Sequence, residues 1–487
     1  MPTAQSDAQS TLVSTYYDTP TLALLRMRLS LRVRKQGRSF LQTVKTEDLG
    51  KMDVLARREW EDPITGNQPS LHAPKTGARL PKAIRREGLR PLFITTVRRK
   101  TIQLAPTPST RIEAALDDGE IRTADGSAIE PIREIELELK CGDPVALYDV
   151  ALELLKLGQV RLEMRSKSER GYRLLGRAAD VPQAVQAGPI TLDCAVTVEA
   201  ALQLFGQRCL NHLLRNEPVV LAGEPEGVHQ MRVAVRRLRS VLSALKPMLS
   251  VEHHRWASKE LNWVTDSLAP ARNWEIFVGD LLHTVSEALP DHHELEHALR
   301  VADRCKRAAF DDVKEAILSR RHTEVALRLL QWFAARGWRD QAVSEGAALL
   351  LAPILEVAPD VIEKCYRKAR QRCKRLKELT PAQRHKLRIA LKKLRYTIEF
   401  VGSLYDKDEV APFLDRLKSL QDYLGHANDV RVAQDLVDQL QEPKDHDARA
   451  IDRAGGIVLG WHERDLIDRE PTLTKHVRRF RQLDPFW

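Results

Sequence analysis

Two similar stretches in the C-terminal half of the chain constrain its fold more than any other feature. HQMRVAVRRLRSVLSAL begins at His229, HKLRIALKKLRYTIEFV begins at His385, and both follow the pattern H-x-x-R-x-x-x-(R/K)-(R/K)-x-R at an offset of 156 residues. The same offset aligns LAPARNWEIF, from Leu268, with LGHANDVRVA, from Leu424, without a gap. The repeat predicts two copies of one helical module.

Each stretch has a basic face and an apolar face when it is placed on a helix. At 100° per residue, four basic residues of the first stretch fall within an arc of about 80° and span about 15 Å. The cations of this face are His229, Arg232, Arg236 and Arg239, repeated as His385, Arg388, Lys392 and Arg395. The apolar face carries Val228, Met231, Val235, Leu238 and Leu242, repeated by Leu387, Leu391, Leu394 and Ile398. One amphipathic pattern is therefore present twice.

A basic helical face is often only solvated, but two features favour an anion-binding site. No acidic residue occurs between His229 and Ser250 or between Arg384 and Thr397, although solvated faces commonly pair Glu with Lys. Like charges three and four residues apart cost stability, so a counter-anion is expected. The basic face also occurs twice at the same spacing, with a histidine at the start of each copy that could donate to phosphate. Arginine donates two parallel hydrogen bonds to phosphate, and a row of such cations suits a linear chain of phosphates.

The chain from about residue 11 to 175 alternates in period two, which predicts an antiparallel β domain. The predicted strands are LSLRVRK, SFLQTVKT, RREWEDP, TTVRRKTIQL, RIEAALDDGEI and REIELELK. Their polar positions carry full charges, such as Arg32 and Arg34 in the first run and Glu134, Glu136, Glu138 and Lys140 in the last. Two hypotheses fit: a sheet with one solvated face, and a barrel whose charged lumen binds an anion and a divalent metal.

The segment ADVPQAVQAGPITL separates this region from the helical one. We predict an α+β multidomain chain, with a β domain at residues 1–175, a linker at 176–195 and an all-α domain at 196–487. The net charge of +10 suggests a polyanionic partner. The six cysteines form no C-x-x-C pair, the N-terminus lacks the pattern of a secretory signal, and no apolar run is long enough to span a bilayer. We expect a cytoplasmic protein without a membrane partner.

The repeated helices and the L-G-x-x-N-D segment resemble the CHAD family over roughly residues 196 to 487. The resemblance implies two pseudo-symmetric four-helix bundles whose basic faces line a groove for inorganic polyphosphate, often at polyphosphate granules. It implies polyphosphate-binding roles for His229, Arg232, Arg236, Arg237, Arg239, His385, Arg388, Lys392, Lys393 and Arg395. The first copy has Arg272 and Asn273 where the second has Asn428 and Asp429, so no catalytic role is assigned there.

The N-terminal runs, together with YYDTP and SKSERGY, resemble the CYTH family, in the family's order. The resemblance implies an antiparallel β tunnel that hydrolyses or cyclises triphosphates with a divalent metal, Mg²⁺ or Mn²⁺. The implied triphosphate contacts are Arg32, Arg34, Lys45, Arg58, Arg99, Lys167 and Arg170. The implied metal-binding candidates are Glu59, Glu61, Glu113, Asp117, Glu136 and Glu138.

One departure from the CYTH pattern bears on activity. The family's first strand, E-x-E-x-K, is expected before YYDTP, and MPTAQSDAQSTLVST does not contain it. Loss of a carboxylate pair would weaken metal binding and misplace the attacking water. A late start codon, a truncated domain and a barrel completed by other residues fit the sequence equally well.

The leading hypothesis is a polyphosphate-binding protein, located at polyphosphate granules, whose tunnel hydrolyses short triphosphates if it is active. One alternative is an active inorganic triphosphatase with a helical scaffold, and another is a non-specific nucleic-acid-binding protein. Nucleic acid is the less favoured partner, because aromatic residues make up only 5% of the chain and none lies between His229 and Lys246. No Gly-rich phosphate loop occurs, and no catalytic residue is assigned.

Overall fold

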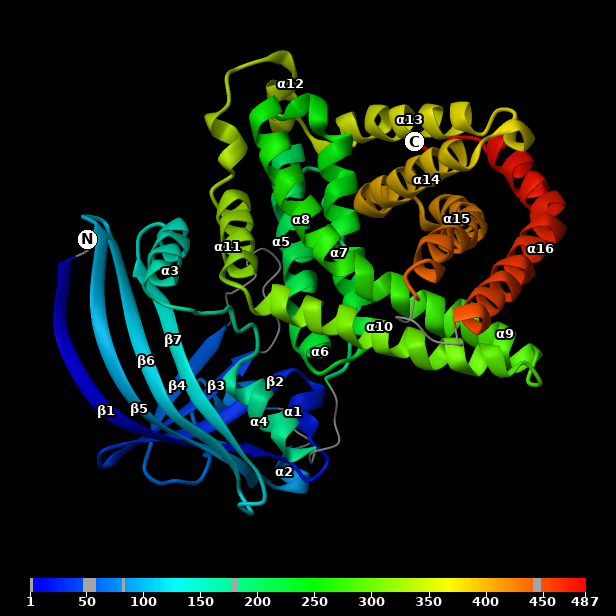
Figure 1. Cartoon of the computed structure of the whole chain (residues 1–487). Coiled ribbons are helices and arrows are strands. Elements are labelled where there is room, and N and C mark those ends of the chain that lie inside the picture. Colours follow the sequence, from blue (N-terminus) through cyan, green and yellow to red (C-terminus); the bar gives the residue numbers. More distant parts are fainter. Residues whose placement is uncertain (1–2, 47–57, 81–83, 177–181, 441–447) are drawn as a thin grey trace. The chain divides into compact units, whose positions relative to one another are not determined.

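The computed structural model of the protein describes residues 3–46, 58–80, 84–176, 182–440 and 448–487. The chain divides into two compact units, Met1–Gln183 and Ala184–Trp487. The first is an antiparallel β domain and the second is helical (Figure 1), which confirms the predicted fold class. The predicted linker limits at residues 176 and 195 stay a prediction. No helix among the described residues is long and apolar enough to cross a membrane.

One antiparallel sheet of seven strands, in the order β4-β3-β2-β1-β5-β6-β7, forms the first unit. The strands are β1 (Thr3–Asp18), β2 (Leu29–Gln36), β3 (Ser39–Thr46), β4 (Glu59–Ile64), β5 (Arg90–Thr107), β6 (Thr110–Thr123) and β7 (Ile129–Cys141). The six predicted runs lie on β2 to β7, although the first residue of RREWEDP falls outside the described residues. Strand β1 is not among the predicted runs, because its polar sequence TAQSDAQSTLVSTYYD gives a weak alternation signal.

The sheet has one apolar face and one charged face. Leu31 and Val33 on β2 are buried in an apolar cluster with Leu24 of α1 (Ala23–Arg26) and Ile84 of α2 (Ile84–Glu87). Helix α3 (Val145–Leu157) covers the same face of β6 and β7. The charged face is concave, because Lys45 on β3 and Glu136 on β7 interact electrostatically although four strands lie between theirs.

Helix α4 (Lys167–Leu175) packs on the concave face and fills one part of it with apolar side chains. Its Tyr172 lies in a cluster with Tyr16 and Phe93 and donates a hydrogen bond of 2.9 Å to Asp18. A side chain at Gly171 would come within 2.1 Å of the Phe93 ring, so glycine permits this close approach. The first turn of α4 is thereby held beside the charged part of the face.

The helical unit repeats at the offset seen in the sequence. Three pairs of helices begin 156 residues apart: α5 (Val198–Arg215) with α13 (Ile354–Arg372), α7 (Pro225–Ala244) with α14 (Pro381–Val401), and α8 (Val251–Ile276) with α15 (Lys407–Val437). The remaining helices are α6 (Glu217–Leu221), α9 (His283–Ala288), α10 (His293–Leu318), α11 (Arg320–Ala334), α12 (Glu345–Ala348) and α16 (Ala448–Arg481).

Reciprocal backbone contacts relate the two copies near the starts of α5 and α13. The amide of Val198 donates to the carbonyl of Ala352 at 3.0 Å, and the amide of Ile354 donates to the carbonyl of Val196 at 2.8 Å. Each donor and acceptor of the first bond lies 156 residues from its equivalent in the second. These contacts follow an approximate two-fold relation, whereas two complete four-helix bundles stay a prediction.

Candidate functional site

Three carboxylates gather on the concave face of the β domain. Asp117 on β6 and Glu134 and Glu136 on β7 each place one oxygen within 4.8 Å of the others. Asp117 pairs with Glu134 across the ladder, and Glu136 follows Glu134 by two residues, so all three point to one face. Hard carboxylate oxygens are the ligands that Mg²⁺ and Mn²⁺ prefer. This acidic group therefore fits a divalent metal.

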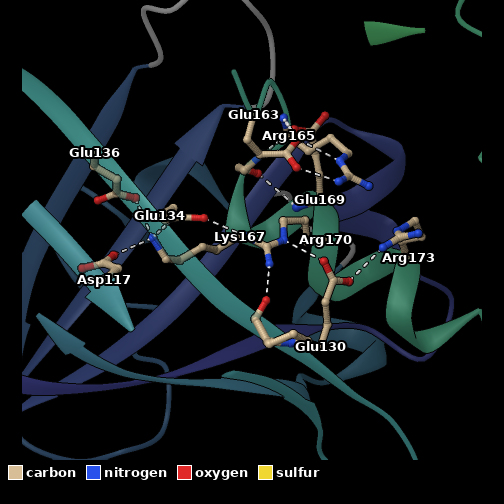
Figure 2. A network of polar contacts seen from close by, with 12 residues as sticks. Asp117, Glu130, Glu134, Glu136, Glu163, Arg165, Lys167, Glu169, Arg170 and Arg173 are labelled. Carbon is tan, nitrogen blue, oxygen red and sulfur yellow. Dashed lines mark hydrogen bonds and ion pairs between the residues drawn. The ribbon is translucent and has the colours of Figure 1, made fainter. Parts of the chain in front are cut away.

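The ammonium of Lys167, in the first turn of α4, reaches all three carboxylates (Figure 2). Its Nζ lies 2.8 Å from Asp117 and 2.6 Å from Glu136, and it also contacts Glu134. Arg99 on β5 pairs with Asp117 at 2.6 Å and with Glu136. Burial would raise the pKa of Glu136, but the charges of Lys167 and Arg99 outweigh it and lower the pKa to about 2. A metal at this group must compete with the lysine ammonium.

Arg170, one turn further along α4, ties the helix to β7. Its Nε lies 2.8 Å from Glu130, its Nη1 lies 2.7 Å from Glu134, and its Nη2 donates to the carbonyl of Pro131. Arg173 adds a second ion pair to Glu130 at 2.8 Å (Figure 2). Arg170 therefore orients Lys167 by holding the helix in place.

The predicted basic residues of β2 and β3 lie on the same concave face. Glu59 on β4 pairs with Lys45 at 2.7 Å and with Arg32 at 3.2 Å. Burial, followed by the charge of Arg32, lowers the pKa of Arg34 to about 10, and the same two causes lower the pKa of Lys45. Glu61 is a further acidic neighbour of Arg34. Cations crowd this part of the face, which favours a bound anion.

Not every predicted tunnel residue joins these groups. Glu113 and Glu138 lie 3.4 and 2.8 Å from Lys140, apart from the three clustered carboxylates. Arg58 is exposed directly before β4. The predicted metal candidates omit Glu134, which the structure places in the acidic group. The alternation in REIELELK could have identified Glu134 as a candidate, because Glu134 and Glu136 occupy one face of a strand.

In the helical unit, α7 and α14 pack against each other (Figure 1), and cations from the two helices lie close together. Arg232 on α7 experiences the positive charges of Arg236 and Arg388, and Arg388 on α14 experiences that of Arg236. Lys392 on α14 experiences the charges of all three arginines. We call Arg232, Arg236, Arg388 and Lys392 the basic cluster. The apolar faces of both helices are buried as predicted, with Leu238 and Leu394 at most 1% exposed.

Burial and mutual repulsion lower the pKa values of side chains in the basic cluster. Burial, followed by the charges of Arg236 and Arg388, lowers the pKa of Lys392 to about 6. Burial and the charges of Arg236 and Arg272 lower the pKa of Arg232 to about 10. Among the described residues, Nη1 of Arg232 and Nε of Arg388 are buried without a hydrogen-bond partner. Unpaired buried donors and crowded cations are costly, and a multiply charged anion would relieve both.

The two predicted histidines have different surroundings. Burial, followed by the charge of Arg272, lowers the pKa of His229 to about 4. His385 instead shares a hydrogen bond of 2.8 Å with the amide oxygen of Asn428. Arg272 and Asn428 occupy equivalent positions of the repeat, so the sequence difference between the copies changes the neighbour of each histidine.

Arg237 and Lys393 connect the two basic helices to each other. Arg237 is buried, lies 3.9 Å from Glu399 and stacks over the Phe205 ring. Lys393 donates to the hydroxyl of Ser243 at 2.8 Å. Positions 393 and 399 follow positions 237 and 243 by 156 residues, so this contact is also reciprocal.

The last pair of predicted cations also has partners within the protein. Arg239 donates to the hydroxyl of Thr265 at 3.2 Å. Arg395 pairs with Glu399 at 2.7 Å and lies 3.4 Å from Gln421, the equivalent of Thr265. These side chains border the basic cluster and fix the neighbouring helices.

Comparisons with known proteins agree with this arrangement. The CYTH domain model matches residues 3–172, and the CHAD domain model matches residues 205–438. An inorganic triphosphatase of Haemophilus influenzae is 31% identical over 163 residues, which are 34% of this chain and 46% of that protein. The chain thus matches less than half the length of that relative.

Two further relatives extend over the helical unit. An uncharacterized protein of Mycobacterium tuberculosis is 27% identical over 465 residues, covering 90% of this chain and 83% of its own length. The crystal structure of the CHAD domain from the plant Ricinus communis matches with a TM-score of 0.53 and 25% identity, over 62% of this chain and 98% of that one. The chain therefore carries a region that matches the CYTH domain model, followed by a region that matches the CHAD domain model.

Proposed function

We propose that the helical unit binds inorganic polyphosphate at the basic cluster, including the long chains of polyphosphate granules. The observation that carries the proposal is the convergence of Arg232, Arg236, Arg388 and Lys392 from two helices, with buried donors that lack partners. A linear polyanion supplies many negative charges without the bulk of a base or a sugar. The match of residues 205–438 to the CHAD domain model supports the same ligand class.

The surroundings of the cluster favour polyphosphate over nucleic acid. Helix α7 contains no aromatic residue. Helix α14 contains Tyr396 and Phe400, which are 6% and 2% exposed and belong to the core. Single-strand binders stack bases on accessible aromatic rings, and neither helix provides one.

Replacement of both half-buried arginines, Arg232→Ala with Arg388→Ala, should lower the affinity of the full chain for long-chain polyphosphate about a hundredfold, because two charge-assisted contacts are lost. The measurement is equilibrium binding at about 150 mM salt with duplex and single-stranded DNA as competitors. Lys407→Ala with Lys418→Ala, at exposed positions of α15, is the matched control. Equal competition by DNA, or unchanged affinity of the arginine variant, would contradict the proposal.

Polyphosphate binding should take up protons at neutral pH. The pKa of Lys392 is lowered to about 6 even though the carboxylate of Asp429 on α15 opposes the shift. Lys392 is therefore mostly uncharged at pH 7, and a bound polyanion raises its pKa. Affinity should therefore fall as the pH rises above 6. Calorimetry in buffers of different ionisation enthalpy counts the protons taken up. Lys392→Arg should remove most of this uptake, because arginine stays charged, and a parent protein with pH-independent binding would refute the coupling.

We also propose a second function, metal-dependent hydrolysis of short triphosphates such as tripolyphosphate. The acidic group beside the basic residues of the tunnel favours it. Asp117, Glu134 and Glu136 would hold Mg²⁺ or Mn²⁺, which supplies charge neutralisation and an oriented water. Arg34 and Lys45 would bind the phosphates. The likeness to an inorganic triphosphatase supports this substrate class.

Two substitutions at the acidic group should have opposite effects on Mn²⁺ binding to the full chain. Glu136→Gln removes a ligand and should weaken binding at least about tenfold, together with any tripolyphosphate hydrolysis. Lys167→Met removes the competing ammonium and should tighten Mn²⁺ binding, measured by titration calorimetry. Lys140→Met is the control, since Lys140 pairs with Glu113 and Glu138 instead. Weaker Mn²⁺ binding by the Lys167 variant would exclude this metal site.

A further inference from the structure

A trough of about 670 Å³ runs along α8 of the helical unit, outside the basic cluster. Its floor is one face of α8 from Val251 to Asp266, about 22 Å of helix at 1.5 Å per residue. Lys246 of the 3₁₀-helix η2 (Lys246–Met248) and Arg321 of α11 also line it. Its length along α8 suits an extended ligand.

The lining is mixed: apolar surface makes up most of it, and three of its basic side chains lack a carboxylate partner among the described residues. Lys246, Arg255 and Lys259 are exposed, and within the described parts of the chain none of them has a carboxylate partner. Arg321 pairs with Glu260 at 3.1 Å, and Asp266 is the acidic member of the lining. The lining therefore carries a net positive charge, which favours an anionic ligand.

The trough adjoins the region of the basic cluster. Burial, followed by the charges of Lys246 and Lys393, lowers the pKa of His254 in the trough. Lys393 lies on α14, one residue from Lys392 of the basic cluster, and its ammonium contacts Ser243 of α7. Positive charge therefore extends from Lys393 of α14 to the start of the trough. Arg239, on the basic face of α7, donates to Thr265 of α8 and interacts electrostatically with Asp266 of the lining.

The second copy of the repeat lacks the cations that line the trough. The positions 156 residues after Lys246, Arg255 and Lys259 are Gly402, Ala411 and Asp415. The basic faces of α7 and α14 are preserved between the copies, whereas the cations of the trough are not. The trough is therefore an addition to the first copy and not a by-product of the repeated fold.

We propose that the α8 trough is a second binding segment for the phosphate chain held at the basic cluster. The inference rests on the proposed polyphosphate function. It adds a second contact surface, the α8 trough, that only longer phosphate chains can reach from the basic cluster. A base-bearing ligand fits less well, because the guanidinium of Arg321 lies 4.8 Å over the ring of Trp263 and occupies one stacking face. Occupation of both segments by one chain raises affinity by effective concentration, so affinity should increase with chain length.

The test compares the full chain with the variant Lys246→Ala, Arg255→Ala, Lys259→Ala, using polyphosphate of about ten and about one hundred phosphates. The variant should lose at least about tenfold in affinity for the long chain and less than about twofold for the short one. Its salt slope with the long chain should fall by about two to three, one unit for each lost phosphate contact. Lys407→Ala, Lys418→Ala, Lys475→Ala removes equal charge from exposed positions and should change neither value.

The outcomes separate the trough from the basic cluster. If the parent binds the long chain, the Arg232→Ala, Arg388→Ala variant does not, and the trough variant equals its control, the trough is no binding segment although the polyphosphate function stands. Equal losses for short and long chains would likewise overturn the second segment. If the parent binds neither chain, the proposed function fails and the inference fails with it.

Discussion

Repulsion between the cations of α7 and α14 is the constraint on which the helical unit depends. Burial of apolar side chains opposite the cations, such as Leu238 and Leu394, contributes about 1.5–3 kcal/mol each and holds the two helices together despite that repulsion. Arg237 and Lys393 add reciprocal contacts between the helices. The fold therefore maintains an arrangement of like charges that an isolated pair of basic helices would avoid, and the proposed polyanion site requires this arrangement.

The β domain also brings like charges close together, but these charges are negative. Asp117, Glu134 and Glu136 lie close enough to repel one another, and Lys167 and Arg99 neutralise them. The pKa of Glu136, about 2, records how strongly these cations favour the ionised carboxylate. Because the neutralising lysine comes from α4, the proposed metal binding would be linked to the position of that helix.

The sequence repeat predicted the helical unit well, because the offset of 156 residues recurs in the starts of three helix pairs. Alternation likewise predicted β2 to β7 and the charged face. Neither pattern could predict that Lys167 reaches the acidic group, since that depends on how Tyr172 and Gly171 dock α4 against Phe93. The sequence patterns also could not predict the partners of Arg237, because those residues lie on other helices of the fold.

The most direct test of the proposed polyanion site is thermal unfolding of the helical unit within the full chain, followed by its helical circular dichroism signal. Arg232→Met with Arg388→Met should raise the melting temperature in the absence of ligand, because repulsion and unpaired donors are removed. Long-chain polyphosphate should stabilise the parent and leave the variant unchanged. A variant that melts at a lower temperature than the parent, or that polyphosphate stabilises equally, would contradict the claim that these cations form a preformed polyanion site.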